Sequence, residues 1–213
     1  MTGDPNSVPR CRYQRKIRFN LREVIDYSPT ADLAAAEEKN GLRAFLGDYD
    51  VVLPSGRAKD ENADPLTKLR SYLTQPCGNA PSRFSDGSFS VAYMGEESET
   101  CRAEVEHHLE DRLKHSAAPK IKTHYFVLAQ FALTGETLDV RRGHPALHDK
   151  NDWGPAQAFG AKAKSNDEDG ITFNAERRAG SEAVAVLKAG LVQSGTRVQI
   201  LGLRWDGSRV VPV

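Results

Sequence analysis

The sequence has few of the features that mark membrane, secreted or nucleic-acid-binding proteins. Its 213 residues include only three cysteines, too few and too scattered for a disulfide framework or a cysteine-rich zinc site. It has no apolar run of about 18 residues, the length of a transmembrane helix, and its N-terminus lacks the apolar core of a secretory signal. Lys and Arg (29) equal Asp and Glu (29), which argues against nucleic-acid binding by bulk electrostatics. We therefore expect a cytoplasmic protein with no membrane or nucleic-acid partner.

Motifs for phosphate loops and metal centres are also missing. Neither GxGxxG nor GxxxxGK occurs in the chain. Four polar side chains at residues 144–152 are close enough in sequence to share a metal ion: His144, His148, Asp149 and Asp152. Pro145 interrupts any regular face there, so a polar loop explains the segment better. We expect no metal, and a metal hydrolase ranks last among the functions considered.

The N-terminal part of the chain differs from the rest. Residues 1–28 are polar and contain a basic run, which favours a solvated arm over a partner-docking segment: Arg10, Arg12, Arg15, Lys16 and Arg18. Ser28 and Pro29 predict the start of a helix that stops near Gly47. Residues 54–64 are typical of a loop. We therefore divide the chain into an N-terminal extension with one helix, residues 1–64, and a main domain, residues 65–213.

The main domain shows both strand and helix periodicities. Residues 66–73 fit a short helix or a strand equally well. Helices are predicted from Ser98, with an apolar stripe at steps of four, and over residues 155–164. Strands are predicted at residues 88–94, 125–133, 170–173 and 183–187, with residues 137–140 continuing the sheet after a turn at Gly135. Asp206-Gly207 indicates a hairpin between strands at 197–205 and 208–211. The sum is a mixed α+β fold with a largely antiparallel sheet flanked by helices.

Two blocks of residues carry the most specific signal. The first has an arginine before a glycine turn, a strand ending in tyrosine, and a helix that opens with Glu-Thr and contains a glutamate: Arg83, Gly87, Tyr93, Glu99, Thr100 and Glu104. The second has a glutamine in a short helix, an Asp-Gly-Ile strand and a following arginine: Gln157, Asp169, Gly170, Ile171 and Arg177. In this order and spacing, over roughly residues 69–192, the blocks resemble the RES family.

The resemblance implies a fold like that of ADP-ribosyltransferases, with residues 65–213 as the RES-like catalytic domain. It also implies a toxin of a bacterial toxin–antitoxin system that consumes NAD as a substrate, and an antitoxin that covers the active site. The family name abbreviates Arg, Glu and Ser, and the first two correspond to Arg83 and Glu104. The serine position corresponds to Ala175, with Asn174 beside it. This departure affects the acceptor step rather than the binding of NAD.

The residue types suit cleavage of the nicotinamide–ribose bond. The bond breaks through an oxocarbenium-like state, which the carboxylate of Glu104 would stabilise. Arg83 would hold the diphosphate, and Tyr93 offers a ring for stacking and a hydroxyl for ribose or nicotinamide. Backbone donors at the helix N-terminus, at Ser98, would add phosphate contacts. Asn174 and Arg177 complete the predicted NAD-binding set. Without the family spacing, each would be read as a surface or packing residue.

The fate of the ADP-ribosyl group stays open at this point: water, phosphate or a target protein are all acceptors within the family. Ala175 and the N-terminal extension make protein ADP-ribosylation a serious option, because simple NAD loss needs no protein-binding surface. The alternative is a catalytically inactive RES-fold binding module that has lost activity with the serine.

Overall fold

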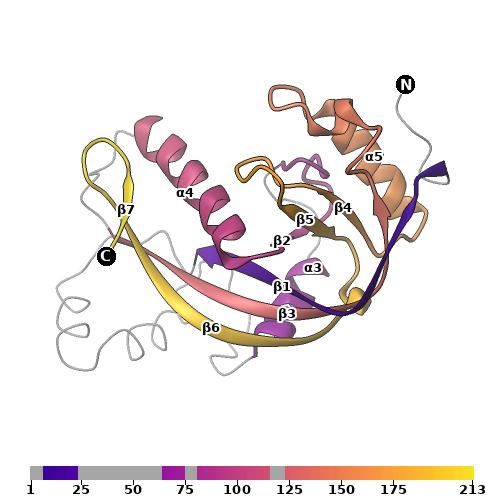
Figure 1. The fold of residues 1–213 in the computed structure, drawn as a ribbon, viewed down its shortest axis with the longest axis horizontal. Helices are drawn as coiled ribbons and strands as arrows, with labels where there is room; N and C mark the ends of the chain where they lie inside the picture. Colours follow the sequence, from indigo (N-terminus) through magenta and orange to yellow (C-terminus); the bar gives the residue numbers. More distant parts are fainter. Residues whose placement is uncertain (1–6, 24–63, 75–80, 116–122) are drawn as a thin grey trace.

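The computed structural model describes residues 7–23, 64–74, 81–115 and 123–213 (Figure 1). Their strands form one seven-stranded sheet in the order β1-β2-β5-β4-β3-β6-β7, and β1 also pairs with β3. The pairings of β1, β2, β5, β4 and β3 therefore close a circuit, and β6 and β7 extend the sheet beyond it. The strands are β1 (Arg10–Glu23), β2 (Ala92–Gly95), β3 (Thr123–Asp139), β4 (Gly170–Asn174), β5 (Glu182–Val186), β6 (Val192–Trp205) and β7 (Val210–Pro212).

Most strand pairs in the described part of the chain run antiparallel. The exception is β3 with β4, which pair in parallel over a short register at Leu138 and Asp139. The α-helices described are α3 (Pro65–Leu73), α4 (Ser98–His115) and α5 (Gly154–Ser165), with 3-10 turns η2 (Pro145–His148) and η3 (Ala189–Leu191). Figure 1 shows α4 above the long strands and α5 at the other end of the molecule. The predicted mixed α+β architecture is confirmed in this coarse form.

The helices bury the faces that their apolar patterns indicate. The stripe on α4 has Cys101, Leu109 and Leu113 buried against strands β3 and β6. The segment at residues 66–73, which fitted a helix or a strand, is helix α3. It begins at Pro65, and the Asp64 carboxylate caps it by accepting the Thr67 backbone N–H at 2.9 Å.

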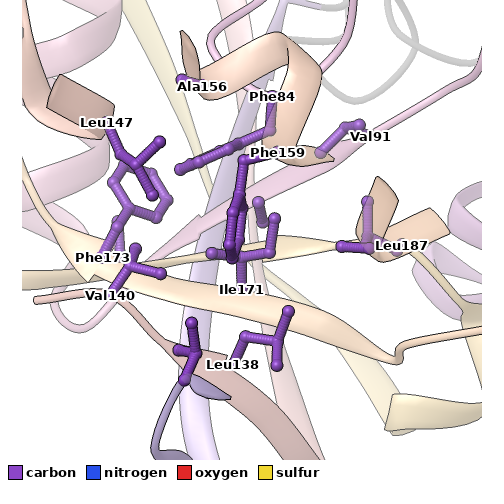
Figure 2. Close-up of a cluster of buried hydrophobic side chains, with 14 of the residues drawn as sticks. Phe84, Val91, Leu138, Val140, Leu147, Ala156, Phe159, Ile171, Phe173 and Leu187 are labelled. Atoms are coloured by element: carbon purple, nitrogen blue, oxygen red, sulfur yellow. The ribbon is translucent and has the colours of Figure 1, made fainter. Parts of the chain in front are cut away.

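Helix α5 covers the largest described core cluster. Ala156, Phe159 and Ala163, the apolar face expected from the sequence, are buried. They pack with Phe84, Leu138, Val140, Ile171 and Phe173 from the sheet and its loops (Figure 2). This cluster supports the segment at residues 82–91, which carries Arg83.

The prediction of a solvated arm at residues 1–28 is wrong for residues 10–23, because these residues form strand β1. The strand pairs with β3 from Arg10 to Glu23, but its register shifts between Tyr13 and Lys16, where Arg15 has a φ of +52°. Tyr13 before the shift and Arg18 after it are both buried. The bulge thus breaks the period of two, and this hides the strand in the sequence.

Buried charge on β1 is neutralised by β5. The Glu182 carboxylate contacts the Arg18 guanidinium and lies 3.2 Å from Lys16 Nζ and 2.6 Å from Arg141 Nη1. Arg18 is 1% exposed. A basic residue can therefore lie inside the sheet here, because its charge is paired.

Further expectations need correction or lie outside the described residues. No turn interrupts β3 at Gly135. The strand runs straight through this glycine, whose φ of +145° is one that other residues rarely adopt. Strand β2 begins at Ala92 rather than at residue 88, and β6 begins at Val192 rather than at residue 197. The helix expected between Ser28 and Gly47 falls outside the described residues. The division into an extension (1–64) and a catalytic domain (65–213) stays a prediction.

Candidate active site

Arg83 lies in a short segment that several contacts hold in place. The Tyr93 hydroxyl accepts the backbone N–H of Phe84 at 3.0 Å and donates to Ser82 Oγ at 2.9 Å. It thus joins the residues on both sides of Arg83. Gln157 of α5 donates its side-chain amide to the Ser82 carbonyl at 3.0 Å. These bonds fix the backbone from which the Arg83 side chain extends.

Helix α5 also touches this segment directly, at Gly160. A Cβ atom on Gly160 would lie 2.0 Å from the Phe84 carbonyl oxygen and 2.8 Å from its carbonyl carbon. Only glycine permits so close an approach of the helix to the backbone. The position of Arg83 therefore depends on a packing contact as well as on hydrogen bonds.

The Arg83 guanidinium is buried and engaged within the chain. Its Nη1 donates to the carbonyls of Leu147, at 3.2 Å, and Asp149, at 3.0 Å. Its Nη2 donates to the Glu176 carboxylate, and the guanidinium lies 6.0 Å from the centre of the Trp153 ring. The side chain is 9% exposed. Arg83 thus ties the η2 region to the turn between β4 and β5.

That turn, at residues 175–181, links the two sequence blocks. Glu176 contacts Arg83 through Oε2, and its Oε1 lies 3.0 Å from Arg177 Nη2. The Arg177 backbone N–H donates in turn to Glu104 Oε1 at 3.1 Å. A continuous chain of polar contacts therefore runs from Arg83 to Glu104.

Glu104 lies in the second turn of α4 and is partly open to solvent. Its side chain is 33% exposed, and its second oxygen lies 3.9 Å from His108 Nε2. One carboxylate oxygen is thus positioned by a backbone donor. The carboxylate therefore keeps access to solvent.

A family model described as the RES domain matches residues 54–206, more than half of the chain.

The chain belongs to the RES domain family.

A comparison with curated proteins finds no match. Among solved structures, this RES protein is similar to the crystal structure of the M. tuberculosis MbcT–MbcA toxin–antitoxin complex, with a TM-score of 0.48 and 13% identity. The similarity covers 91% of this chain and 86% of that one.

In this RES protein the predicted site residues fall into two groups. Arg83, Glu104 and Arg177 belong to the one polar network. Tyr93 contacts the residues on both sides of Arg83, and its ring lies edge-on to Phe173 at 6.1 Å between centroids. Burial raises the pKa of the Tyr93 hydroxyl, so it stays protonated and acts as a hydrogen-bond donor. We expected that hydroxyl to meet ribose or nicotinamide; in this structure it is bonded to Ser82 and Phe84.

Ser98 and Asn174 form the second group, because their contacts lead elsewhere. Ser98 is the first residue of α4, and its hydroxyl donates to Glu99 Oε2 at 2.9 Å. Asn174 ends β4; it donates its side-chain amide to the Arg141 carbonyl at 2.8 Å and its backbone N–H to His148 Nε2 at 3.3 Å. Their roles in binding NAD stay predictions.

Ala175, at the family's serine position, begins the turn at residues 175–181. It is buried, and its backbone N–H donates to the Ser181 carbonyl at 2.9 Å. The neighbouring Glu176 was missed in the sequence, although it is the residue that joins Arg83 to Arg177. Its position between Ala175 and Arg177 in the second block was the signal available, but a single carboxylate in a turn is usually solvated.

Among the described residues, no group of three or more His, Cys, Asp and Glu side chains is arranged to hold a metal ion. None of the helices in the same part of the chain is long and apolar enough to cross a membrane.

Proposed function

We propose that this RES protein is the toxin of a bacterial toxin–antitoxin pair and that it cleaves the nicotinamide–ribose bond of NAD. Family membership supports the general reaction. The observation that carries the proposal is the contact chain from Arg83 through Glu176 and Arg177 to Glu104. It unites an arginine suited to a diphosphate with a carboxylate suited to a ribosyl cation.

The reaction moves positive charge from the nicotinamide ring to the ribose. The bond between ribose C1 and the ring nitrogen breaks, and its electron pair leaves with neutral nicotinamide. A cation then develops across C1 and the ring oxygen of the ribose. A carboxylate about 4 Å away contributes about 4 kcal/mol at an effective dielectric constant of about 20, or about a thousandfold in rate. Glu104 supplies this charge in the proposal.

The other residues bind and orient the donor. Arg83 contacts the diphosphate as a forked cation, and Arg177 adds a second guanidinium on the adjoining turn. Tyr93 acts through Arg83, because its hydroxyl joins the residues on either side of that arginine. Ser98 and Asn174 are further donor contacts. NAD is the substrate, and no metal takes part in the proposed step.

The acceptor completes the reaction by attacking ribose C1 with an oxygen or nitrogen atom; water or a protonated side-chain group then loses a proton, whereas an anionic phosphate oxygen has none to lose. We propose water, phosphate or a side chain of a target protein as this acceptor. Ala175 brings no hydroxyl to the family's serine position, which favours protein ADP-ribosylation as a serious option. The proposal also includes an antitoxin that covers the active site and a cytoplasmic location.

The experiment that tests the proposal follows the fate of labelled NAD. Purified protein is incubated with labelled NAD, alone and with a cell lysate, and both small products and labelled protein bands are measured. We expect free nicotinamide from the wild-type protein and a loss of about a hundredfold or more in Glu104→Gln. Glu106→Gln is the matched control, because Glu106 is on the same helix and pairs with Arg102 at 2.6 Å. NAD unchanged over hours, with no labelled protein, refutes the proposal.

A second candidate is an inactive RES-fold module that binds a partner or NAD without turnover. Two observations favour it: Ala175 has no hydroxyl, and the Arg83 guanidinium is already paired with Glu176. This candidate predicts NAD binding with no release of nicotinamide, and no loss of toxicity in Glu104→Gln.

A further inference from the structure

We propose that Glu176 sets the affinity of the site for the donor diphosphate, because its carboxylate occupies the edge of Arg83 that a phosphate would use. This inference rests on the proposed function, since it assumes an NAD-type donor. It concerns a residue that lies outside the Arg, Glu and Ser positions of the family.

Three of the five N–H donors of the Arg83 guanidinium are engaged within the chain. Both donors of Nη1 are directed to backbone carbonyls, at 3.2 Å and 3.0 Å, and Nη2 donates to Glu176. Carboxylates and phosphates bind a guanidinium through the same forked geometry. A diphosphate that contacts Arg83 at Nη2 therefore competes with the Glu176 carboxylate for this nitrogen.

The Glu176 carboxylate has a second cationic partner, Arg177. Its Oε1 lies 3.0 Å from Arg177 Nη2, while Oε2 contacts Arg83. A rotation of the side chain toward Arg177 would release Arg83 and keep the carboxylate paired. This matters because Glu176 is only 13% exposed, and an unpaired charge at that depth is costly.

The balance of charges in the polar network also indicates that Glu176 opposes binding of the diphosphate. Arg83 and Arg177 carry two positive charges, which Glu104 and Glu176 balance. A donor diphosphate adds two negative charges, so it meets repulsion from Glu176. Removing this one carboxylate leaves an excess positive charge beside the diphosphate. We therefore expect Glu176→Gln to bind NAD more tightly than the wild-type protein does.

The test measures binding without turnover. Glu176→Gln is made in the Glu104→Gln background, so that NAD survives the titration. The double variant and the Glu104→Gln parent are each titrated with NAD and with ADP-ribose. We expect Kd about tenfold lower for both ligands in the double variant, a difference of about 1.4 kcal/mol. Nicotinamide riboside, which lacks phosphate, should bind both proteins equally. Glu136→Gln in the same background is the charge-matched control, because Glu136 pairs with the exposed Arg12 on β1.

Unchanged or weaker binding of NAD by the double variant overturns the inference, as does an equal gain for nicotinamide riboside or for Glu136→Gln. Glu176→Asp serves as a second variant: it keeps the charge of the turn but withdraws it from Arg83, so it should give a smaller gain, and a loss of affinity overturns the inference. Failure of the proposed function is seen separately, as the absence of NAD turnover by the wild-type protein. Tighter binding by Glu176→Gln would stand even then.

Discussion

The contact between Gly160 and the Phe84 backbone yields the sharpest prediction about how the fold supports the site. Gly160 lies inside α5, where alanine ordinarily stabilises a helix by about 1 kcal/mol relative to glycine. Propensity alone therefore predicts that Gly160→Ala raises stability. The structure predicts the opposite, because the new Cβ would lie 2.0 Å from the Phe84 carbonyl oxygen.

The size of the effect follows from the distances. Real Cβ contacts essentially never fall below 3.0 Å, so the helix and the carbonyl must separate by about 1 Å. Overpacking against backbone costs about 3 kcal/mol, since no side-chain rotation relieves it. After the helix-propensity gain, a net loss of about 2 kcal/mol remains. For a chain of this length, this lowers Tm by about 4–8 °C.

Activity should fall further than stability. Phe84 follows Arg83 directly, so a shift of its carbonyl moves the guanidinium as well. A displacement of about 1 Å in a positioned group can cost about a hundredfold in rate. The assays are thermal unfolding and NAD turnover on the same samples, below the Tm of the variant.

Gly154→Ala is the matched control, because it adds the same atom to the same helix. There the Cβ would meet only the Asp152 carboxylate, at 3.0 Å, and that side chain can move. We expect its Tm and turnover to stay close to those of the wild-type protein. The reasoning is refuted if Gly160→Ala is as stable and as active as Gly154→Ala.

Three further predictions concern the surroundings of the site. Tyr93→Phe removes the hydroxyl that joins Ser82 to Phe84; urea unfolding should show a loss of about 1–3 kcal/mol, and kcat/KM for NAD should fall while Tyr93→Phe stays folded. The side-chain hydrogen bond from Arg141 holds the pKa of Asp139 below its usual range. The Asp139 carboxylate therefore stabilises the fold above its unfolded pKa of about 4, and this stabilisation is lost as pH falls through the lower folded pKa. Asp139→Asn should flatten the acid side of a stability–pH curve measured by urea unfolding. Ala175→Ser adds one hydroxyl at a buried position and should leave the protein folded, with a cost of about 1–2 kcal/mol in urea unfolding; a protein that no longer folds would show that the family's serine position cannot be restored in this chain.

Several elements followed from local pattern because local interactions form them. The stripe on α4 and the face of α5 repeat at helical spacing, and both helices bury those residues. The hairpin between β6 and β7 needed only the Asp206 side chain, which accepts the backbone N–H groups of Ser208 and Arg209, and a φ of +112° at Gly207.

Strand β1 could not be predicted in the same way. Its bulge shifts the buried face from Tyr13 to Arg18, so no single period describes it. The burial of Arg18 depends on Glu182, which is distant in sequence and arrives with β5. A basic run reads as solvated until its partner carboxylate is known.

The sequence by itself determined the family and the α+β class, because motif order and spacing are properties of the chain. It also predicted Arg83 and Glu104 as site residues, and their roles stay predictions. Tertiary structure decided what holds these residues. The turn at residues 175–181 places the Glu176 carboxylate in contact with both Arg83 and Arg177. The missing side chain at Gly160 lets helix α5 pack against the backbone next to Arg83. Such contacts join residues far apart in the chain, and only packing in three dimensions determines which carboxylate meets which guanidinium.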